Sequence, residues 1–180
     1  SKFLILMLFA IGAISFVGCK DDDPVVVPPV VSGEHTGFIS ANETWSADII
    51  HTLKDRVVVR EGVTLTIEPG TIIKGEAGAG VNASALVIAR GATINAAGTA
   101  DKPIIFTSIA DEIAIGEKAG ANLDEKSAKG FWGGVIILGA APTSPKTGAT
   151  EQIEGIPASV IEGNYGGTNA EDNSGVFTYV

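Results

Sequence analysis

The hydrophobic positions of this chain fall in short runs that are separated by glycine-containing turns. Between residues 56 and 108 the sequence reads RVVVREGVTLTIEPGTIIKGEAGAGVNASALVIARGATINAAGTADKPIIFTS. Alternation within each run points one set of side chains inward, which marks Val58, Leu65, Ile67 and Ile72 as candidate core residues. Strands this short, bounded by glycine corners, favour a parallel β-helix over a sandwich.

The same stretch contains a tandem repeat, because VVVREGVTLTIEPGT returns as LVIARGATINAAGT. Gly62 matches Gly91 (91 − 62 = 29), and Thr64 is expected to lie over Thr93. A repeat of this size indicates a solenoid, in which each unit buries its apolar side against the next one. We therefore predict an all-β fold in which residues 56–180 form the rungs of a parallel β-helix.

The segments around the repeat suggest how the solenoid begins, is interrupted and stops. Residues 36–55 lack the repeat and are interpreted as an N-terminal cap. Trp45 is its largest apolar side chain, with a sugar-stacking role as the alternative. Residues 109–130 are interpreted as an inserted loop, which is either a solvated decoration or part of a binding surface. The apolar strand at 176–180 has no cap, so we expect a C-terminally incomplete solenoid that belongs to a longer protein.

The N-terminus carries the features of an exported protein. Lys2 precedes the apolar run FLILMLFAIGAISFV, which is short for a membrane span of about 20 residues, so residues 1–18 are predicted to be a signal peptide. The only cysteine, Cys19, follows directly. The sequence FVGC resembles the lipobox of bacterial lipoproteins, which implies acylation of Cys19, for example with palmitate. Several acyl chains, at about 0.8 kcal/mol per buried CH₂, would anchor the protein to a membrane.

Residues 19–35 are interpreted as a tether, because a charged cluster is followed by the Pro-rich run PVVVPPVVSG. The cluster comprises Lys20, Asp21, Asp22 and Asp23. Acids at this position are either part of a solvated tether or a signal. The sequence CKDDD resembles the lipoprotein export signal of Bacteroidetes, which implies a location on the outer membrane, facing the cell exterior.

Composition and charge narrow the range of partners. The formal net charge is −9, and the basic residues are dispersed among acids. A nucleic-acid partner is therefore not expected, because a groove for a phosphate backbone needs clustered Lys and Arg. The 23 glycines and the aromatic content of 6% suit tight turns between short strands better than a helical core.

Several motifs considered together resemble one protein group. LTIEPGTIIKG, LVIARGATINAAGTADKPIIFTS, FWGGVIILG and YGGTNAEDNSGVFTYV are similar to segments of Bacteroidetes surface lipoproteins with a right-handed parallel β-helix. The resemblance covers residues 45–180. It implies the handedness of the fold and a surface location, but it does not imply a reaction.

Known catalytic motifs are missing from the sequence, which contains no G-x-S-x-G, Walker, H-E-x-x-H or C-x-x-C pattern. His35 and His51 fall in the predicted tether and cap, so hydrolysis through histidine is not predicted. We therefore expect a binding or structural module without a cofactor, whose partner is a glycan or a surface protein. Trp132 and Tyr165 are the candidate ligand contacts.

The alternative is a polysaccharide lyase or hydrolase that acts on acidic glycans. β-Helices that resemble pectate lyases use Ca²⁺ to neutralise a uronate and a Lys or Arg as the base. Glu171, Asp172 and Asn173 are weak candidates for metal ligands, although the same residues also suit a turn. Arg60 and Arg90 are expected to fall near one another (90 − 60 = 30), but the acids do not stack with them.

Overall fold

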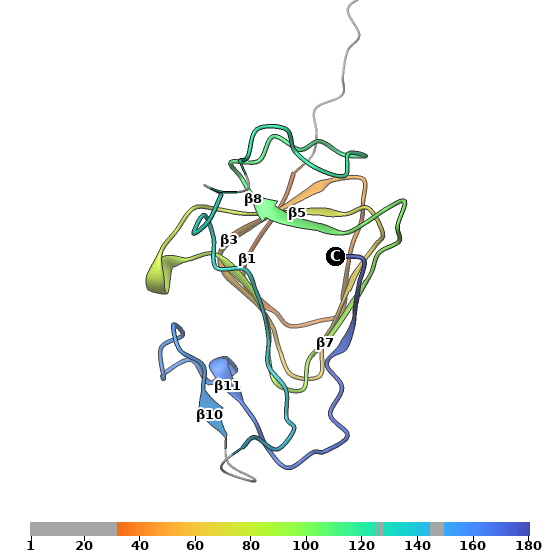
Figure 1. Ribbon diagram of the computed structural model, residues 1–180. Coiled ribbons are helices and arrows are strands. Elements are labelled where there is room, and N and C mark those ends of the chain that lie inside the picture. Colours follow the sequence, from red (N-terminus) through yellow and green to blue (C-terminus); the bar gives the residue numbers. More distant parts are fainter. Residues whose placement is uncertain (1–31, 125, 127, 145–149) are drawn as a thin grey trace, which may run out of the picture.

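The computed structural model describes residues 32–124, 126, 128–144 and 150–180 (Figure 1). The predicted signal peptide, Cys19 and the charged cluster after it lie outside the described residues. The described part is strand and turn, apart from the short 3-10 helices η1 (Gly80–Asn82) and η2 (Ile161–Gly163). The strands are β1 (Ser32–Ile39), β2 (Glu43–Trp45), β3 (Ile50–Val59), β4 (Thr64–Ile67), β5 (Ile72–Gly75), β6 (Ala85–Ile88), β7 (Thr93–Ala97), β8 (Ile105–Ser108), β9 (Val135–Ile137), β10 (Glu151–Gln152), β11 (Asn164–Tyr165) and β12 (Gly175–Thr178).

Strands from successive turns of the chain pair in parallel around a common interior. A six-stranded sheet with the order β8-β5-β3-β6-β9, with β1 paired to β3, supplies two sides of the molecule. A four-stranded sheet with the order β12-β7-β4-β2 supplies the third side. The strands trace a three-sided outline in Figure 1. The prediction of an all-β fold built as a parallel β-helix is therefore confirmed.

Two strands turn a corner of this outline because they bend in the middle. β3 bends at Asp55, which has a φ of +55°, and β1 bends next to Gly37, which has a φ of +70°. The first half of β3 pairs with β5, and its second half pairs with β6. A left-handed backbone conformation is uncommon outside glycine, but aspartate tolerates it better than most residues.

The structure changes the interpretation of the N-terminal segments. Residues 36–55 are not a separate cap, because β1, β2 and the first half of β3 form a coil of the same kind as those that follow. β2 pairs with β4 through Glu43 and Leu65 (65 − 43 = 22), and β4 pairs with β7 at an offset of 29 (94 − 65 = 29). The shorter first coil hid the repeat. β1 begins at Ser32, so residues 32–35, assigned above to the tether, also belong to this coil.

A continuous apolar cluster fills the interior of the coils. Leu65 and Ile67 belong to it, as predicted, and they are paired with Ile94 and Ala96 of the next coil. Thr64 lies beside Thr93, also as predicted. The buried members of the cluster are Ile39, Trp45, Leu53, Val57, Val59, Val63, Leu65, Ile67, Ile73, Leu86, Ile88, Ala92, Ile94, Ala96 and Ile104.

The other two predicted core residues, Val58 and Ile72, are buried on the outer side of their strands. They alternate with Val57, Val59 and Ile73, which face the interior. The inward orientation predicted for Val58 and Ile72 is therefore wrong by one residue. Alternation along the sequence sets the two faces apart, but it does not reveal that an outer face is covered as well.

Long connections cover these outer faces. Residues 109–134 link β8 to β9, and Lys74 on β5 holds this loop by donating to the carbonyl oxygens of Asp111 (2.7 Å) and Ile113 (2.9 Å). Residues 138–174 link β9 to β12 and include the antiparallel pair β10 and β11, which lies outside the three-sided outline (Figure 1). An outer apolar cluster joins this second connection to the sheet. Its buried members are Val58, Ala85, Val87, Ala89, Leu138 and Ile156, with Ile136, Ile153, Val160 and Tyr165 packed against them.

Candidate ligand groove

A hollow with a polar lining lies where two corners of the β-helix face the connection that carries η2. It has a volume of about 600 Å³. One wall comes from the β3–β4 and β6–β7 corners, and the other comes from η2 and the residues beside it. We call this hollow the corner groove. Its lining residues are Ser40, Arg60, Glu61, Val63, Ala89, Arg90, Ile161, Glu162 and Asn164.

Arg60 and Arg90 lie at neighbouring corners of successive coils but one residue out of register, because the offset of 29 between paired residues aligns Arg60 with Ala89 and Glu61 with Arg90. Arg60 lies two residues before the corner glycine Gly62, and Arg90 lies one residue before the corner glycine Gly91. The two glycines have φ values of +78° and +77°. The N–H of Gly62 donates to the carbonyl oxygen of Gly91 at 2.9 Å, so the corners are stacked directly. Glycine adopts this left-handed conformation without the penalty that a Cβ brings. The two corners therefore contribute two guanidinium groups to the same groove, from positions that differ by one residue.

The arginines connect the corners to the long connection between β9 and β12. Arg60 Nη2 lies 3.1 Å from Glu162 Oε1, and its guanidinium sits 4.8 Å from the ring centre of Phe38. Arg90 Nη1 donates to the carbonyl oxygen of Gly166 at 3.1 Å. The Glu162 side chain is 12% exposed, whereas that of Arg60 is 48% exposed. The ion pair is thus screened by water on the arginine side, and its contribution to stability is modest.

This geometry corrects the view of Arg60 and Arg90 as basic corners without acids. Glu61 and Glu162 line the same groove, although neither follows the repeat beside the arginines. Glu162 could not be found from the sequence, because it lies 102 residues from Arg60 in a connection whose path has no repeat signal. The groove therefore combines two guanidinium groups with two carboxylates and the amide of Asn164.

The two predicted ligand contacts are placed apart and outside the corner groove. Trp132 packs against Gly75 and stacks with Phe106 at 6.4 Å between ring centres, beside a hollow of about 290 Å³. Tyr165 lines another hollow of about 370 Å³ and donates its hydroxyl to Glu151 at 3.1 Å. This hydrogen bond and the negative charge of Glu151 raise the pKa of Tyr165. Both aromatic residues contact neighbouring side chains and line separate hollows, and their roles as ligand contacts stay predictions.

The weak metal candidates hold the backbone of their own turn and of a neighbouring loop. The N–H of Ala140 donates to Asp172 Oδ2 at 2.8 Å. Asn173 accepts from the N–H of Gly175 at 2.8 Å, and the N–H of Glu171 donates to Asn169. Among the residues that the structure describes, no three His, Cys, Asp or Glu side chains converge as metal ligands would.

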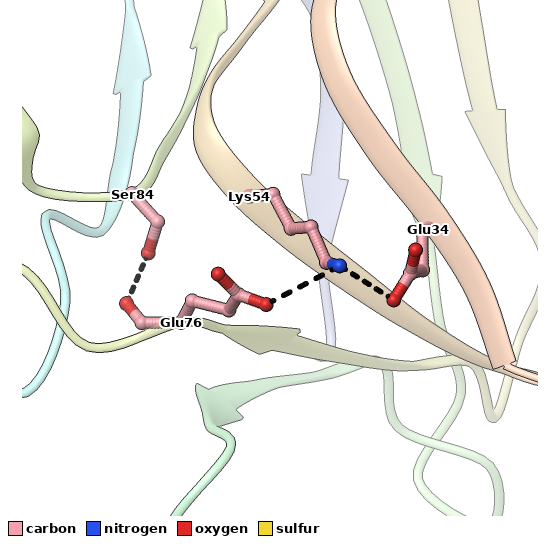
Figure 2. Close-up of polar contacts among 4 residues, drawn as sticks. All are labelled: Glu34, Lys54, Glu76 and Ser84. Carbon is pink, nitrogen blue, oxygen red and sulfur yellow. Dashed lines mark hydrogen bonds and ion pairs between the residues drawn. The ribbon is translucent and has the colours of Figure 1, made fainter.

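A charged ladder crosses the outer side of the first three coils, on a different side from the groove. Figure 2 shows Lys54 reaching between Glu34 and Glu76. Its Nζ lies 2.7 Å from Glu34 Oε1 and 3.8 Å from Glu76 Oε1. The hydrogen bond to Glu34 is the main reason why the pKa of Lys54 is raised. Ser84 donates to the carbonyl oxygen of Glu76 and so links this ladder to the start of β6.

No helix in the described ranges, 32–124, 126, 128–144 and 150–180, is long and apolar enough to cross a membrane. The chain shows no significant similarity to a curated protein or to a solved structure. The model of one family, the pectate-lyase-like β-helix domain, matches residues 37–180 and thus most of the chain. This match agrees with the stacked parallel strands and with the groove along their corners. The chain belongs to the family of pectate-lyase-like β-helix domains.

Proposed function

We propose that this protein is a cell-surface β-helix that binds a glycan in the corner groove. The observation that carries the proposal is that Arg60 and Arg90, from corners of successive coils, line one groove together with Glu162. Guanidinium donors from two coils offer contacts at two points of the groove, which suits a ligand with several hydroxyl or carboxylate acceptors. The family match supports a carbohydrate-related module.

The groove has the donors and acceptors that a carbohydrate requires. A guanidinium carries five N–H donors, and one contact of each arginine leaves others to face the groove. Glu61, Glu162 and Asn164 offer acceptors for sugar hydroxyls. Hydrogen bonds to charged groups contribute about 1.5–3 kcal/mol each, so the loss of both guanidinium groups would weaken binding by tenfold or more.

We also propose that Cys19 is acylated and that residues 20–23 direct the protein to the outer face of the outer membrane. The support is the sequence FVGCKDDD and its resemblance to surface lipoproteins of Bacteroidetes. A tether at this end would enter the first strand, β1, directly. The sense of the coil is inferred to be right-handed, because crossovers between parallel strands of one sheet are right-handed in about 98% of cases.

A polysaccharide lyase or hydrolase acting on acidic glycans is the second candidate, and the same groove favours it. Glu61 and Glu162 would contribute carboxylates, and Arg60 or Arg90 would act as the base. Glu162 is already paired with Arg60, however, which leaves that carboxylate less able to bind Ca²⁺. Binding therefore remains the function that the geometry supports best.

The deciding experiment mixes the full chain with acidic and neutral polysaccharides, with and without Ca²⁺, and follows polymer length and co-migration by size-exclusion chromatography. Co-migration with an intact polymer is the expected result. The double variant Arg60→Gln/Arg90→Gln should bind the polymer at least tenfold more weakly. Arg56→Gln is the matched control, because Arg56 bonds to the carbonyl oxygen of Val81 and does not line the groove.

Two results would overturn the proposal. Shortening of a polymer that depends on the groove arginines would replace the binding module with an enzyme. The lack of co-migration with every polymer would exclude a glycan and leave a protein partner. The anchor is tested separately with Cys19→Ala, which should release the protein from the membrane fraction, and with protease treatment of intact cells, which should remove the wild-type protein.

A further inference from the structure

Three stacked rings close the interior of the β-helix at its N-terminal end. His35 on β1, Trp45 on β2 and His51 on β3 contribute one ring each. The ring centres of His35 and Trp45 are 4.3 Å apart, and those of His51 lie 5.1 Å from both. Trp45 is 1% exposed and His51 is 2% exposed. His51, which follows His35 by 16 residues in sequence, is thus buried in the core, and His35 packs half-buried against it.

The hydrogen bonds of the two imidazoles fix which nitrogen carries the proton. His51 Nε2 lies 3.0 Å from the carbonyl oxygen of Ser46, so it must donate. A neutral His51 then has a bare Nδ1, which lies 2.9 Å from His35 Nε2 and accepts its proton. The pair as built is therefore complete when both rings are neutral.

Protonation conflicts with this arrangement in two stages. A first proton can bind Nδ1 of His35 without breaking the contact between His35 Nε2 and His51 Nδ1, but the charge then lies against buried rings. A second proton would place two N–H donors against each other across 2.9 Å, which breaks the contact. Glu43, which accepts from Trp45 Nε1 at 3.2 Å, is the nearby acid that favours the charged rings. Glu34 and Lys54, the charged residues next in β1 and β3, pair with each other instead.

We propose that this ring cluster is a pH-sensitive lock on the first coil, and that protonation of the histidine pair releases β1 from β3. Among the described strands β1 is paired with β3 alone, so its other edge has no strand partner there. Release would add the eight residues of β1 to the segment that precedes it. In an anchored protein this change would lengthen the tether in acid.

The direction of the pH effect follows from the environment of the rings. Burial is the main cause that lowers the pKa of both His35 and His51 below the usual 6.5. The unfolded or released segment therefore binds more protons than the closed coil. The stability of the coil is fully present above about pH 6.5 and declines as the pH falls below it. At pH 5.5 the opening equilibrium would rise by about tenfold for each histidine that stays neutral in the closed form.

The test uses the fact that the chain contains two histidines only, so every imidazole signal belongs to this pair. Amide hydrogen exchange of β1 is measured at pH 7.5 and pH 5.5 in the full chain, relative to β7 so that the intrinsic pH effect cancels. We expect the protection of β1, relative to that of β7, to be at least tenfold lower at pH 5.5 than at pH 7.5. Nuclear magnetic resonance titration of the two imidazoles should give pKa values below 6.5.

Two variants separate a switch from a structural role. His35→Phe/His51→Phe keeps the rings but binds no proton, and the relative protection of its β1 should not change with pH. Trp45→Phe keeps both histidines, so it should lower protection at both pH values and retain the tenfold ratio. The proposal is overturned if the relative protection of β1 in the wild-type protein is equal at pH 7.5 and pH 5.5, or if the double variant shows the same pH-dependent loss as the wild type. It is also overturned if the imidazoles titrate at or above pH 6.5. The titration of the wild-type protein decides the matter even where the double variant does not fold.

Discussion

The substitution Gly75→Ala is expected to destabilise the protein, although alanine normally improves on glycine in a strand. Gly75 is buried at the end of β5, and Trp132 lies directly over its Cα. An added Cβ would meet Cε3, Cδ2 and Cβ of Trp132 at 2.6, 2.7 and 2.8 Å. Its backbone is not in the left-handed region, so the effect is steric and not conformational. The indole would have to leave its position between Gly75 and Phe106.

The size of the effect follows from two opposing contributions. A compatible glycine-to-alanine change stabilises by about 0.4–1 kcal/mol, because it restricts the unfolded chain. Overpacking of a filled site costs about 1–3 kcal/mol. The sum is a net loss of about 1–2 kcal/mol for Gly75→Ala. In a Trp132→Gly background every atom that the added Cβ would meet is removed, so the same change should be neutral or stabilising.

A double-mutant cycle measured by urea denaturation and far-UV circular dichroism checks this reasoning. The coupling between the two positions should be about 1–3 kcal/mol, well above the error for sites that act independently. Equal effects of Gly75→Ala in both backgrounds would refute the contact. Such a result would also restore Trp132 as a free surface residue that is available to a ligand.

Three further substitutions test the stack, its corners and its loop. Leu65 lies in the interior and is 0% exposed, so Leu65→Ala should lower the free energy of unfolding by about 2–5 kcal/mol, as measured by urea denaturation. Thr66→Ala on the outer side should change it by no more than about 1 kcal/mol. Equal losses would contradict the inward orientation of Leu65. Gly62→Ala should lose about 1–2 kcal/mol at its φ of +78°, and an increase in stability would disprove the need for a left-handed corner. Lys74→Met removes both hydrogen bonds to the 109–134 loop, so proteinase K should cut this loop faster while the midpoint of urea unfolding changes little. An unchanged cleavage rate would show that other contacts hold the loop.

The sequence predicts the parts of the fold that depend on neighbouring residues. Strands 57–59, 64–67 and 86–88 follow from apolar alternation and from the paired glycines 62 and 91, and the structure has strands at these places. The first coil was missed because Lys54 and Asp55 look like a break in an apolar run. In the structure Lys54 faces outward to Glu34, and Asp55 provides the bend.

Only one wall of the candidate groove could be predicted from the sequence. The sequence shows that Arg60 and Arg90 both lie beside the repeated glycines 62 and 91, so their placement at neighbouring corners is predictable. Glu162 and Asn164 are not, because their position depends on how the connection 138–174 folds back on the coils. The burial of Val58 has the same cause, since the outer cluster that covers it comes from that connection. Contacts between a repeat and an insertion leave no periodic signal in either part.

The coils form the apolar interior and the connections between them vary in length, which explains where a ligand site can arise in this chain. The stacking offset in the four-stranded sheet grows from 22 (65 − 43) to 29 (94 − 65) and then to 81 (175 − 94). The paired strands stay short throughout, so the interior is not altered by the growth. The entropic cost of closing the longer connection is small, about 1 kcal/mol for a nearly fourfold increase in length. Later coils can therefore extend outward without loss of the stack, and the longest connection returns to the corner of an earlier coil, where Glu162 meets Arg60. The repeat thus supplies neighbouring corners that carry Arg60 and Arg90, and the connection supplies the second wall of the groove.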